Sequence, residues 1–232
     1  MKQALLFTIF YFVFLVGCLQ AEPVRILAIG DSITQGGKTF VTYRLPLDQK
    51  LRAAGLNFEF VGSQQSEGPN GPLRHEGYGG KNAEFLAGII PQKLRQLNPD
   101  VILLHCGHNH SAEEKPVSGI LSAERTIIEA ARKQNPKVVV LLAQVITSGK
   151  LPKYSYIPEL NQAQVLLARE LSRPDAPVVL VDQATGFDPQ KDTISDKVHP
   201  NVQGAEKMAD KWFLALKRWV NSSGALGIRP KD

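Results

Sequence analysis

The sequence predicts an α/β protein, a three-layer α/β/α sandwich built on a five-stranded parallel sheet. Short apolar runs rich in Val, Ile and Leu alternate with segments of helical periodicity, which is typical of parallel strands joined by crossover helices. Two of the runs, residues 100–105 and 137–143, are almost wholly apolar, as expected of strands buried on both faces. Five strands are too few for an eight-stranded barrel, so an open sheet with helices on both sides is expected.

The predicted strands and helices follow one another with clear boundaries. Strands are expected at residues 24–29, 57–61, 100–105, 137–143 and 178–181, and helices at 39–54, 82–97, 116–134, 156–171 and 201–220. Gly55 ends the first helix, and Asn98-Pro99 stops the second. Residues 62–80 contain six glycines and two prolines, so they are predicted to form a loop that is too long to serve only as a connector.

The composition is that of a globular protein. The 232 residues, 43% hydrophobic and 21% charged, suffice for one α/β domain, which we expect at residues 22–221 with a flexible tail at 222–232. The formal net charge is +5, but basic residues never occur in runs of more than two. Because no basic stripe is present, a nucleic-acid partner is not expected. The composition leaves the oligomeric state open.

The first 21 residues predict an export signal rather than part of the fold. Lys2 precedes an apolar run, and no further charge occurs before residue 22. The run is shorter than the ~20 apolar residues of a membrane span. Cleavage after residue 21 would give a secreted protein, whereas residues 15–18 (LVGC) resemble a bacterial lipobox, in which Cys18 would carry a lipid anchor. We therefore expect a secreted, periplasmic or cell-envelope protein with no membrane contact beyond this anchor.

Two segments carry a candidate nucleophile and its base. Ser32 follows the first strand in Gly30-Asp31-Ser32, where a helical region begins and a backbone N–H can bind an anion. The same serine could instead be a plain helix N-cap. Asp196 and His199 lie three residues apart before the closing helix. Their spacing can place a carboxylate on the imidazole Nδ1 and leave Nε2 free to take a proton from a serine.

Two further segments carry candidate donors for an oxyanion. Asn109 follows the third strand, and its carboxamide could donate to a developing negative charge. Gly80 ends the long loop, where the absence of a side chain lets a backbone N–H approach a substrate closely, although Gly79-Gly80 could equally form a tight turn. Cys106 lies at the end of the third strand and is expected to be a buried structural thiol rather than a nucleophile.

In their order along the chain, the four segments resemble the SGNH hydrolases, also called the GDSL-like esterase family. That family is named for a Ser, a Gly, an Asn and a His, which correspond here to Ser32, Gly80, Asn109 and His199, with Asp196 beside the last. The resemblance implies the flavodoxin-like SGNH hydrolase fold and a catalytic set of Ser32, Asp196 and His199. It also implies an oxyanion hole of Ser32, Gly80 and Asn109, and no metal or organic cofactor.

A closer resemblance is to the acetylxylan-esterase-like branch, carbohydrate esterase family 3. The shared features are GDSIT at residues 30–34, Tyr43-Arg44, Leu47, FVGS at residues 60–63 and HEGYGG at residues 75–80. In that branch Arg44 and the His75-Glu76 pair look like scaffold around the long loop, although they could equally be surface residues here.

One block departs from the family pattern. The third block usually reads G-T-N-D, whereas residues 107–110 read G-H-N-H. Asn109 is kept, but His108 and His110 replace residues that normally brace the loop. These two histidines, with Asp31, are candidates for touching the substrate or bracing the loop. With the histidine at the end of the strand they also suggest a metal site, but no other Cys/His cluster supports it and none is predicted.

Together these observations predict an exported serine esterase that removes acyl groups, acetyl above all, from carbohydrate through an acyl-enzyme. Its substrate would be a small ester or an acetylated polysaccharide. Two alternatives stay open: a lysophospholipase or general lipid esterase, and a catalytically degenerate carbohydrate-binding protein, which the unusual third block would favour. The sequence contains no G-x-S-x-G elbow, which argues against the α/β-hydrolase fold.

Overall fold

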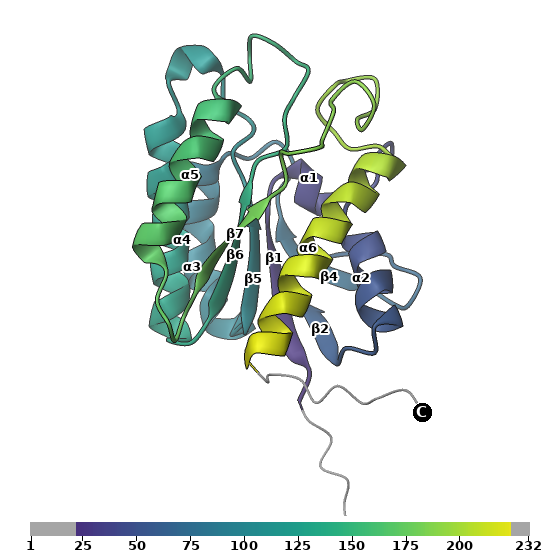
Figure 1. Ribbon diagram of the computed structural model, residues 1–232, viewed down its shortest axis with the longest axis vertical. Helices are drawn as coiled ribbons and strands as arrows, with labels where there is room; N and C mark the ends of the chain where they lie inside the picture. The colour runs from purple at the N-terminus through teal and green to yellow at the C-terminus, as the bar shows by residue number, and fades with distance from the viewer. Residues whose placement is uncertain (1–21, 224–232) are drawn as a thin grey trace, which may run out of the picture.

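Helices cover both faces of one central sheet in the computed structural model, which describes residues 22–223 (Figure 1). The strands are β1 (Val24–Gly30), β2 (Phe58–Val61), β3 (Gln64–Ser66), β4 (Leu73–Gly77), β5 (Val101–His105), β6 (Val139–Gln144) and β7 (Val178–Asp182). The helices are α1 (Ser32–Gln35), α2 (Arg44–Ala53), α3 (Ala83–Leu97), the 3₁₀-helix η1 (Ala112–Glu114), α4 (Val117–Gln134), α5 (Ile157–Leu171) and α6 (Val202–Ser223). Within this range, none of the helices combines the length and apolar character that a membrane span requires.

The predicted three-layer α/β fold is confirmed, but the sheet has seven strands rather than five. Six lie in the order β3-β4-β1-β5-β6-β7, and β2 also pairs with β1. All pairings are parallel except that of β3 with β4. β2 pairs with the first half of β1, and β4 pairs with Ile29 and Gly30 at the end of β1. One edge of β1 is therefore shared by two strands.

The two strands that the prediction missed lie within the 62–80 segment. β3 and β4 are short and largely polar, reading QQS and LRHEG, so neither shows the apolar run that marks a buried strand. Gly62 separates β2 from this hairpin, and a Cβ on it would lie 2.4 Å from the backbone of His75. The segment is thus an extension of the sheet beside the end of β1.

Two helix boundaries also differ from the prediction. The helix expected at 39–54 forms only as α2, because residues 36–43 make a loop that begins at Gly36 with φ of 84°. The closing helix α6 continues through Ser223, so the first two residues of the predicted tail are helical. The predicted signal at residues 1–21, with Cys18, and the rest of the tail at 224–232 lie outside the described residues.

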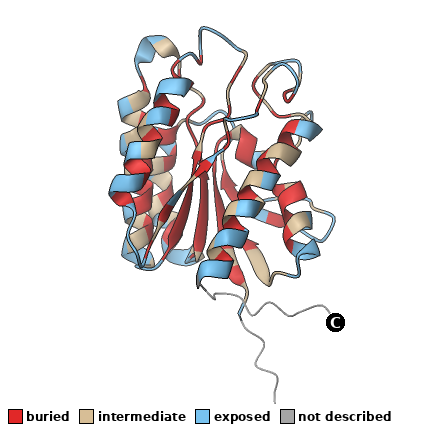
Figure 2. Cartoon of the chain, in the orientation of Figure 1, coloured by how far each residue is buried: buried red, intermediate tan, exposed pale blue. Residues whose placement is uncertain are grey.

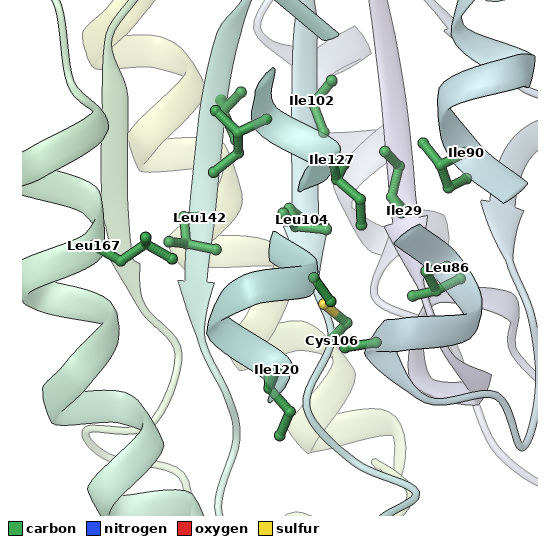
Figure 3. Close-up of a cluster of buried hydrophobic side chains, with 14 of the residues drawn as sticks. Ile29, Leu86, Ile90, Ile102, Leu104, Cys106, Ile120, Ile127, Leu142 and Leu167 are labelled. Carbon is green, nitrogen blue, oxygen red and sulfur yellow. The ribbon is translucent and has the colours of Figure 1, made fainter. Parts of the chain in front are cut away.

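Each face of the sheet packs against its own helices. Successive side chains of a strand point to opposite faces, so Leu27 and Ile29 pack with α3, α4 and α5, whereas Ile26 and Ala28 pack with α2 and α6. Figure 2 shows buried residues along the strands and on the inward sides of the helices. Figure 3 shows the first of these clusters, in which Cys106 lies as a free, buried thiol. Its burial raises the pKa of the thiol, as suits the structural role predicted for it.

The side chain of Arg44 joins α1 to the hairpin of β3 and β4. It is fully buried and donates to the carbonyl oxygens of Thr34 at 2.7 Å, Gln35 at 2.9 Å and Leu73 at 3.1 Å, and to the Ser66 hydroxyl at 2.5 Å. Burial lowers its pKa to about 10, which leaves the guanidinium charged at neutral pH. Because the donors of a guanidinium lie in one rigid plane, these acceptors are held in a fixed arrangement.

Replacing Arg44 should therefore destabilise the fold. Arg44→Lys keeps the charge but cannot reach all four acceptors, so the free energy of unfolding should fall by at least about 2 kcal/mol. Arg125→Lys is the matched control, because Arg125 pairs with Glu170 at the surface and exposed pairs contribute about 0–1 kcal/mol. Chemical denaturation followed by circular dichroism measures both variants, and equal losses would contradict the role given to Arg44.

Candidate active site

Ser32 is the first residue of α1 and follows directly on the end of β1. The N-cap of this helix is Asp31, whose Oδ1 accepts a hydrogen bond from the N–H of Ile33 at 2.9 Å. The reading of Ser32 as the cap is therefore wrong, and its hydroxyl is left for another partner. Gly30 lets β1 approach β5 closely here, since a Cβ on it would lie 2.3 Å from the carbonyl oxygen of His105.

Ser32, His199 and Asp196 form a continuous hydrogen-bonded chain. Ser32 Oγ lies 2.8 Å from His199 Nε2, and His199 Nδ1 lies 2.5 Å from Asp196 Oδ2. The second carboxylate oxygen accepts the backbone N–H groups of Val198 and His199. Although burial opposes ionisation, the hydrogen bonds from His199 and from the backbone lower the pKa of Asp196, so this carboxylate is charged at neutral pH. The imidazole is thus oriented with Nε2 towards the serine.

Asn109 and the Gly79-Gly80 segment meet beside Ser32. A Cβ on Gly79 would lie 3.8 Å from Ser32 Cβ, which places this loop against the serine. Asn109 Nδ2 donates to the Lys81 carbonyl at 2.9 Å, and because a carboxamide carries two N–H bonds, one remains for another acceptor. Asn109 and Gly80 both adopt left-handed backbone conformations, with φ of 69° and 74°, which Asn and Gly tolerate best. The loop that carries Gly80 therefore lies against Ser32, and Asn109 is hydrogen-bonded to the residue that follows Gly80.

This arrangement agrees with comparisons against known proteins. The model of the GDSL-like lipase/acylhydrolase family matches residues 28–207. The chain belongs to this family. It is therefore a carboxylic ester hydrolase, as the four sequence blocks predict.

Two solved structures resemble the hydrolase closely in fold. A carbohydrate esterase family 3 protein from Talaromyces cellulolyticus is 25% identical, with a TM-score of 0.76 over 86% of this chain and 99% of that one. A family 3 carbohydrate esterase from Clostridium thermocellum is 26% identical, with a TM-score of 0.73 over 87% of this chain and 98% of that one. The comparison with curated proteins found no match.

His108 and Asp31 form a buried pair next to the serine of the hydrolase. Their side chains are 2% and 1% exposed, and His108 Nδ1 lies 3.8 Å from Asp31 Oδ2, too far for a direct hydrogen bond. Neither of these atoms, nor Nε2 of His108, has a hydrogen-bond partner within residues 22–223. Burial lowers the pKa of His108 well below its ordinary value and raises the pKa of Asp31 to about 6. His108 is therefore a neutral packing residue, in contact with Tyr154 at 5.1 Å between ring centroids.

His110 is held between two carboxylates. Its Nδ1 lies 2.9 Å from Glu114 and its Nε2 lies 2.9 Å from Glu84, so the ring joins the 107–110 loop to η1 and α3. The side chain is 7% exposed, and both ring nitrogens face the protein, which favours bracing of the loop over contact with a substrate. In the part of the chain that the structure describes, no group of three or more His, Cys, Asp and Glu side chains could hold a metal ion.

Two contacts of the site involve residues that sequence reasoning missed. The ring of Phe40 stacks on His199, with centroids 4.2 Å apart and planes inclined by 25°. The N–H of Gly79 donates to Gln35 Oε1 at 2.5 Å, which joins α1 to the glycine loop. Phe40 falls in a segment predicted as helix, and its partner is far away in sequence. No local pattern could have revealed the stack.

The raised pKa of Asp31 predicts a pH-dependent contribution to stability. The folded state binds the carboxyl proton of Asp31 more tightly than the unfolded state, in which the pKa is 3.8. The protonated carboxyl therefore stabilises the fold at low pH, and this stabilisation is lost as the pH rises through about 6. Asp31→Asn keeps an acceptor for the helix N-terminus but cannot titrate. Between about pH 4 and pH 7 the free energy of unfolding of the variant should therefore gain about 2 kcal/mol relative to wild type.

Urea unfolding of both proteins at several pH values measures this difference. A difference that does not change with pH would show that Asp31 ionises normally in the folded protein.

Proposed function

We propose that this hydrolase is an exported serine esterase that removes acetyl groups from carbohydrate, with Ser32 as nucleophile. The observation that carries the proposal is the hydrogen-bonded chain from Ser32 through His199 to Asp196. A serine, an imidazole and a carboxylate in this order are the parts that acyl transfer requires. Their presence in one connected geometry supports catalysis over a degenerate binding role.

In the first half of the reaction, Ser32 Oγ attacks the ester carbonyl carbon while His199 Nε2 takes the serine proton. Asp196 stabilises the imidazolium that forms. The carbonyl oxygen becomes an oxyanion, which the backbone N–H groups of Ser32 and Gly80 and the free N–H of Asn109 can receive. His199 then gives its proton to the leaving alcohol, the carbon–oxygen bond of the ester breaks, and the acyl group stays on Ser32.

In the second half, water replaces the alcohol. His199 removes a proton from the water, which attacks the acyl carbon, and the same donors receive the second oxyanion. When this intermediate collapses, His199 returns its proton to Ser32 Oγ and the carboxylic acid departs. The enzyme is restored without any group besides its own side chains and water.

The substrate class rests on two lines of support. The solved structures from Talaromyces and Clostridium are carbohydrate esterases of family 3, and each of them is covered almost completely by this chain. Acetyl esters of insoluble or polymeric carbohydrate lie outside the cell, which agrees with the basic start and apolar run at residues 1–21. We therefore place the reaction outside the cytoplasm.

The role of the serine is tested by removing its hydroxyl. Ser32→Ala should reduce the hydrolysis of 4-nitrophenyl acetate by at least about 10³-fold, because no acyl-enzyme can form. Ser122→Ala, which removes an exposed hydroxyl on α4, is the control and should keep wild-type turnover. Retained turnover in the folded Ser32→Ala protein would refute the assignment.

The role of the carboxamide is tested at position 109. Asn109→Ala should lower kcat by roughly 10²–10³ with little change in KM, as expected for a donor used in the transition state. In Asn109→Gly the new glycine adopts the left-handed backbone without strain, and kcat should fall as much as in Asn109→Ala. Equal losses would show that the missing donor, and not backbone strain, lowers kcat.

Asn98→Ala is the matched control, because Asn98 is also left-handed but caps α3. It should leave kcat unchanged. A loss below threefold in both position-109 variants would show that the donor lies elsewhere.

A further inference from the structure

A cavity of about 330 Å³ with both polar and apolar walls lies beside Gln35, the last residue of the helix α1 that Ser32 begins. Its walls come from the end of α1 and the loop at 36–42, from Leu45 at the start of α2, from β3 with the residue that follows it, and from β4. The polar residues that line it include Gln35, Lys38, Gln64, Glu67 and His75, and Phe40 and Leu45 add apolar surface. The volume falls in the range of about 300–1,000 Å³ that is usual for small-molecule sites.

Phe40 connects the cavity to the general base, so the alcohol part of an ester can reach it. In the proposed reaction His199 Nε2 protonates the leaving oxygen, so the group that carries this oxygen must extend past the His199 ring. Phe40 stacks on that ring at 4.2 Å and also lines the cavity. A leaving group at His199 can therefore continue along Phe40 into the cavity, whereas the carbonyl oxygen of the ester is received by Gly80 and Asn109.

The lining suits a sugar better than an acyl chain. The amide of Gln64 can donate and accept hydrogen bonds, the carboxylate of Glu67 accepts and the ammonium of Lys38 donates. Sugar hydroxyls can satisfy all of these groups, and the C–H face of a sugar ring can pack on Phe40. A hydrocarbon chain in the same place would desolvate the polar groups without replacing their hydrogen bonds.

The walls of the cavity are fixed relative to Ser32. Buried Arg44 donates to the Gln35 carbonyl at 2.9 Å and to the Ser66 hydroxyl at 2.5 Å, so one cation holds the walls contributed by α1 and by β3. Burial lowers the pKa of His75 to about 3, so this histidine is neutral at neutral pH and adds no charge to the cavity. A site whose walls are held in this way needs little rearrangement to bind.

We infer that this cavity is the subsite for the sugar unit that carries the acetyl ester. The inference rests on the proposed function and names the part of the chain that recognises the carbohydrate. Gln64 is the residue through which to test it, because it pairs with His75 in the sheet and shares a face of β3 with Ser66. It is exposed, so its replacement should not disturb the core.

The experiment compares two substrates, an acetylated xylo-oligosaccharide and 4-nitrophenyl acetate, which lacks a sugar. For each protein, kcat/KM on the oligosaccharide is divided by kcat/KM on the small acetate. This ratio should fall about fivefold in Gln64→Ala, which removes one hydrogen-bonding group. It should fall by at least about tenfold in Gln64→Trp, whose ring fills the cavity.

Gln134→Ala and Gln134→Trp are the matched controls. Gln134 is an exposed residue at the end of α4, which packs on the other face of the sheet, so both ratios should equal that of wild type. Circular dichroism checks that all four variants are folded.

The outcomes separate the two claims. If wild type cleaves the oligosaccharide and the ratio of folded Gln64→Trp equals that of wild type, the subsite is wrong while the proposed function stands. If wild type cleaves only the small acetate, the carbohydrate assignment and the subsite fail together, but the ester hydrolase remains. A fall in the ratio for both Gln64 variants and for neither control supports the subsite.

Discussion

The close approach of β1 and β5 at Gly30 is the constraint on which the site depends. Because residue 30 has no side chain, the carbonyl oxygen of His105 can lie where a Cβ would be only 2.3 Å away. The chain that leaves β1 begins α1 with Ser32, and the chain that leaves β5 continues to Asn109. Two hydrogen-bonded parallel strands thus bring the proposed nucleophile and a proposed oxyanion donor to one edge of the sheet, where open α/β sheets bind ligands.

The two aspartates near Ser32 show how position divides their roles. Asp196 lies partly exposed in a loop, and its hydrogen bonds from His199 and the backbone lower its pKa below the ordinary value. Asp31 caps α1 in the interior, where burial raises its pKa to about 6. Similar carboxyl groups in unlike surroundings therefore ionise over different pH ranges. Asp196 orients the imidazole of His199, and Asp31 caps the helix that Ser32 begins.

The parts of the molecule that sequence predicts are those with a local signal. Apolar runs gave β1, β5, β6 and β7, and the four blocks gave Ser32, Gly80, Asn109 and His199 with its Asp196. β3 and β4 were missed because they are short and polar, and because β4 depends on pairing with β1, which is distant in sequence. Phe40 was missed because its contact with His199 depends on tertiary packing alone, as do the carboxylates that surround His110.

The central claim is that Ser32 is the nucleophile that His199 activates, and covalent labelling tests it most directly. A fluorophosphonate reacts with an activated serine, and mass spectrometry of the digested protein locates the adduct. We expect one adduct, on the peptide that contains Ser32, in the wild-type protein. We also expect much slower labelling of folded His199→Ala, in which the base is missing. Labelling of another serine, or labelling of Ser32 at an unchanged rate in His199→Ala, would contradict the account.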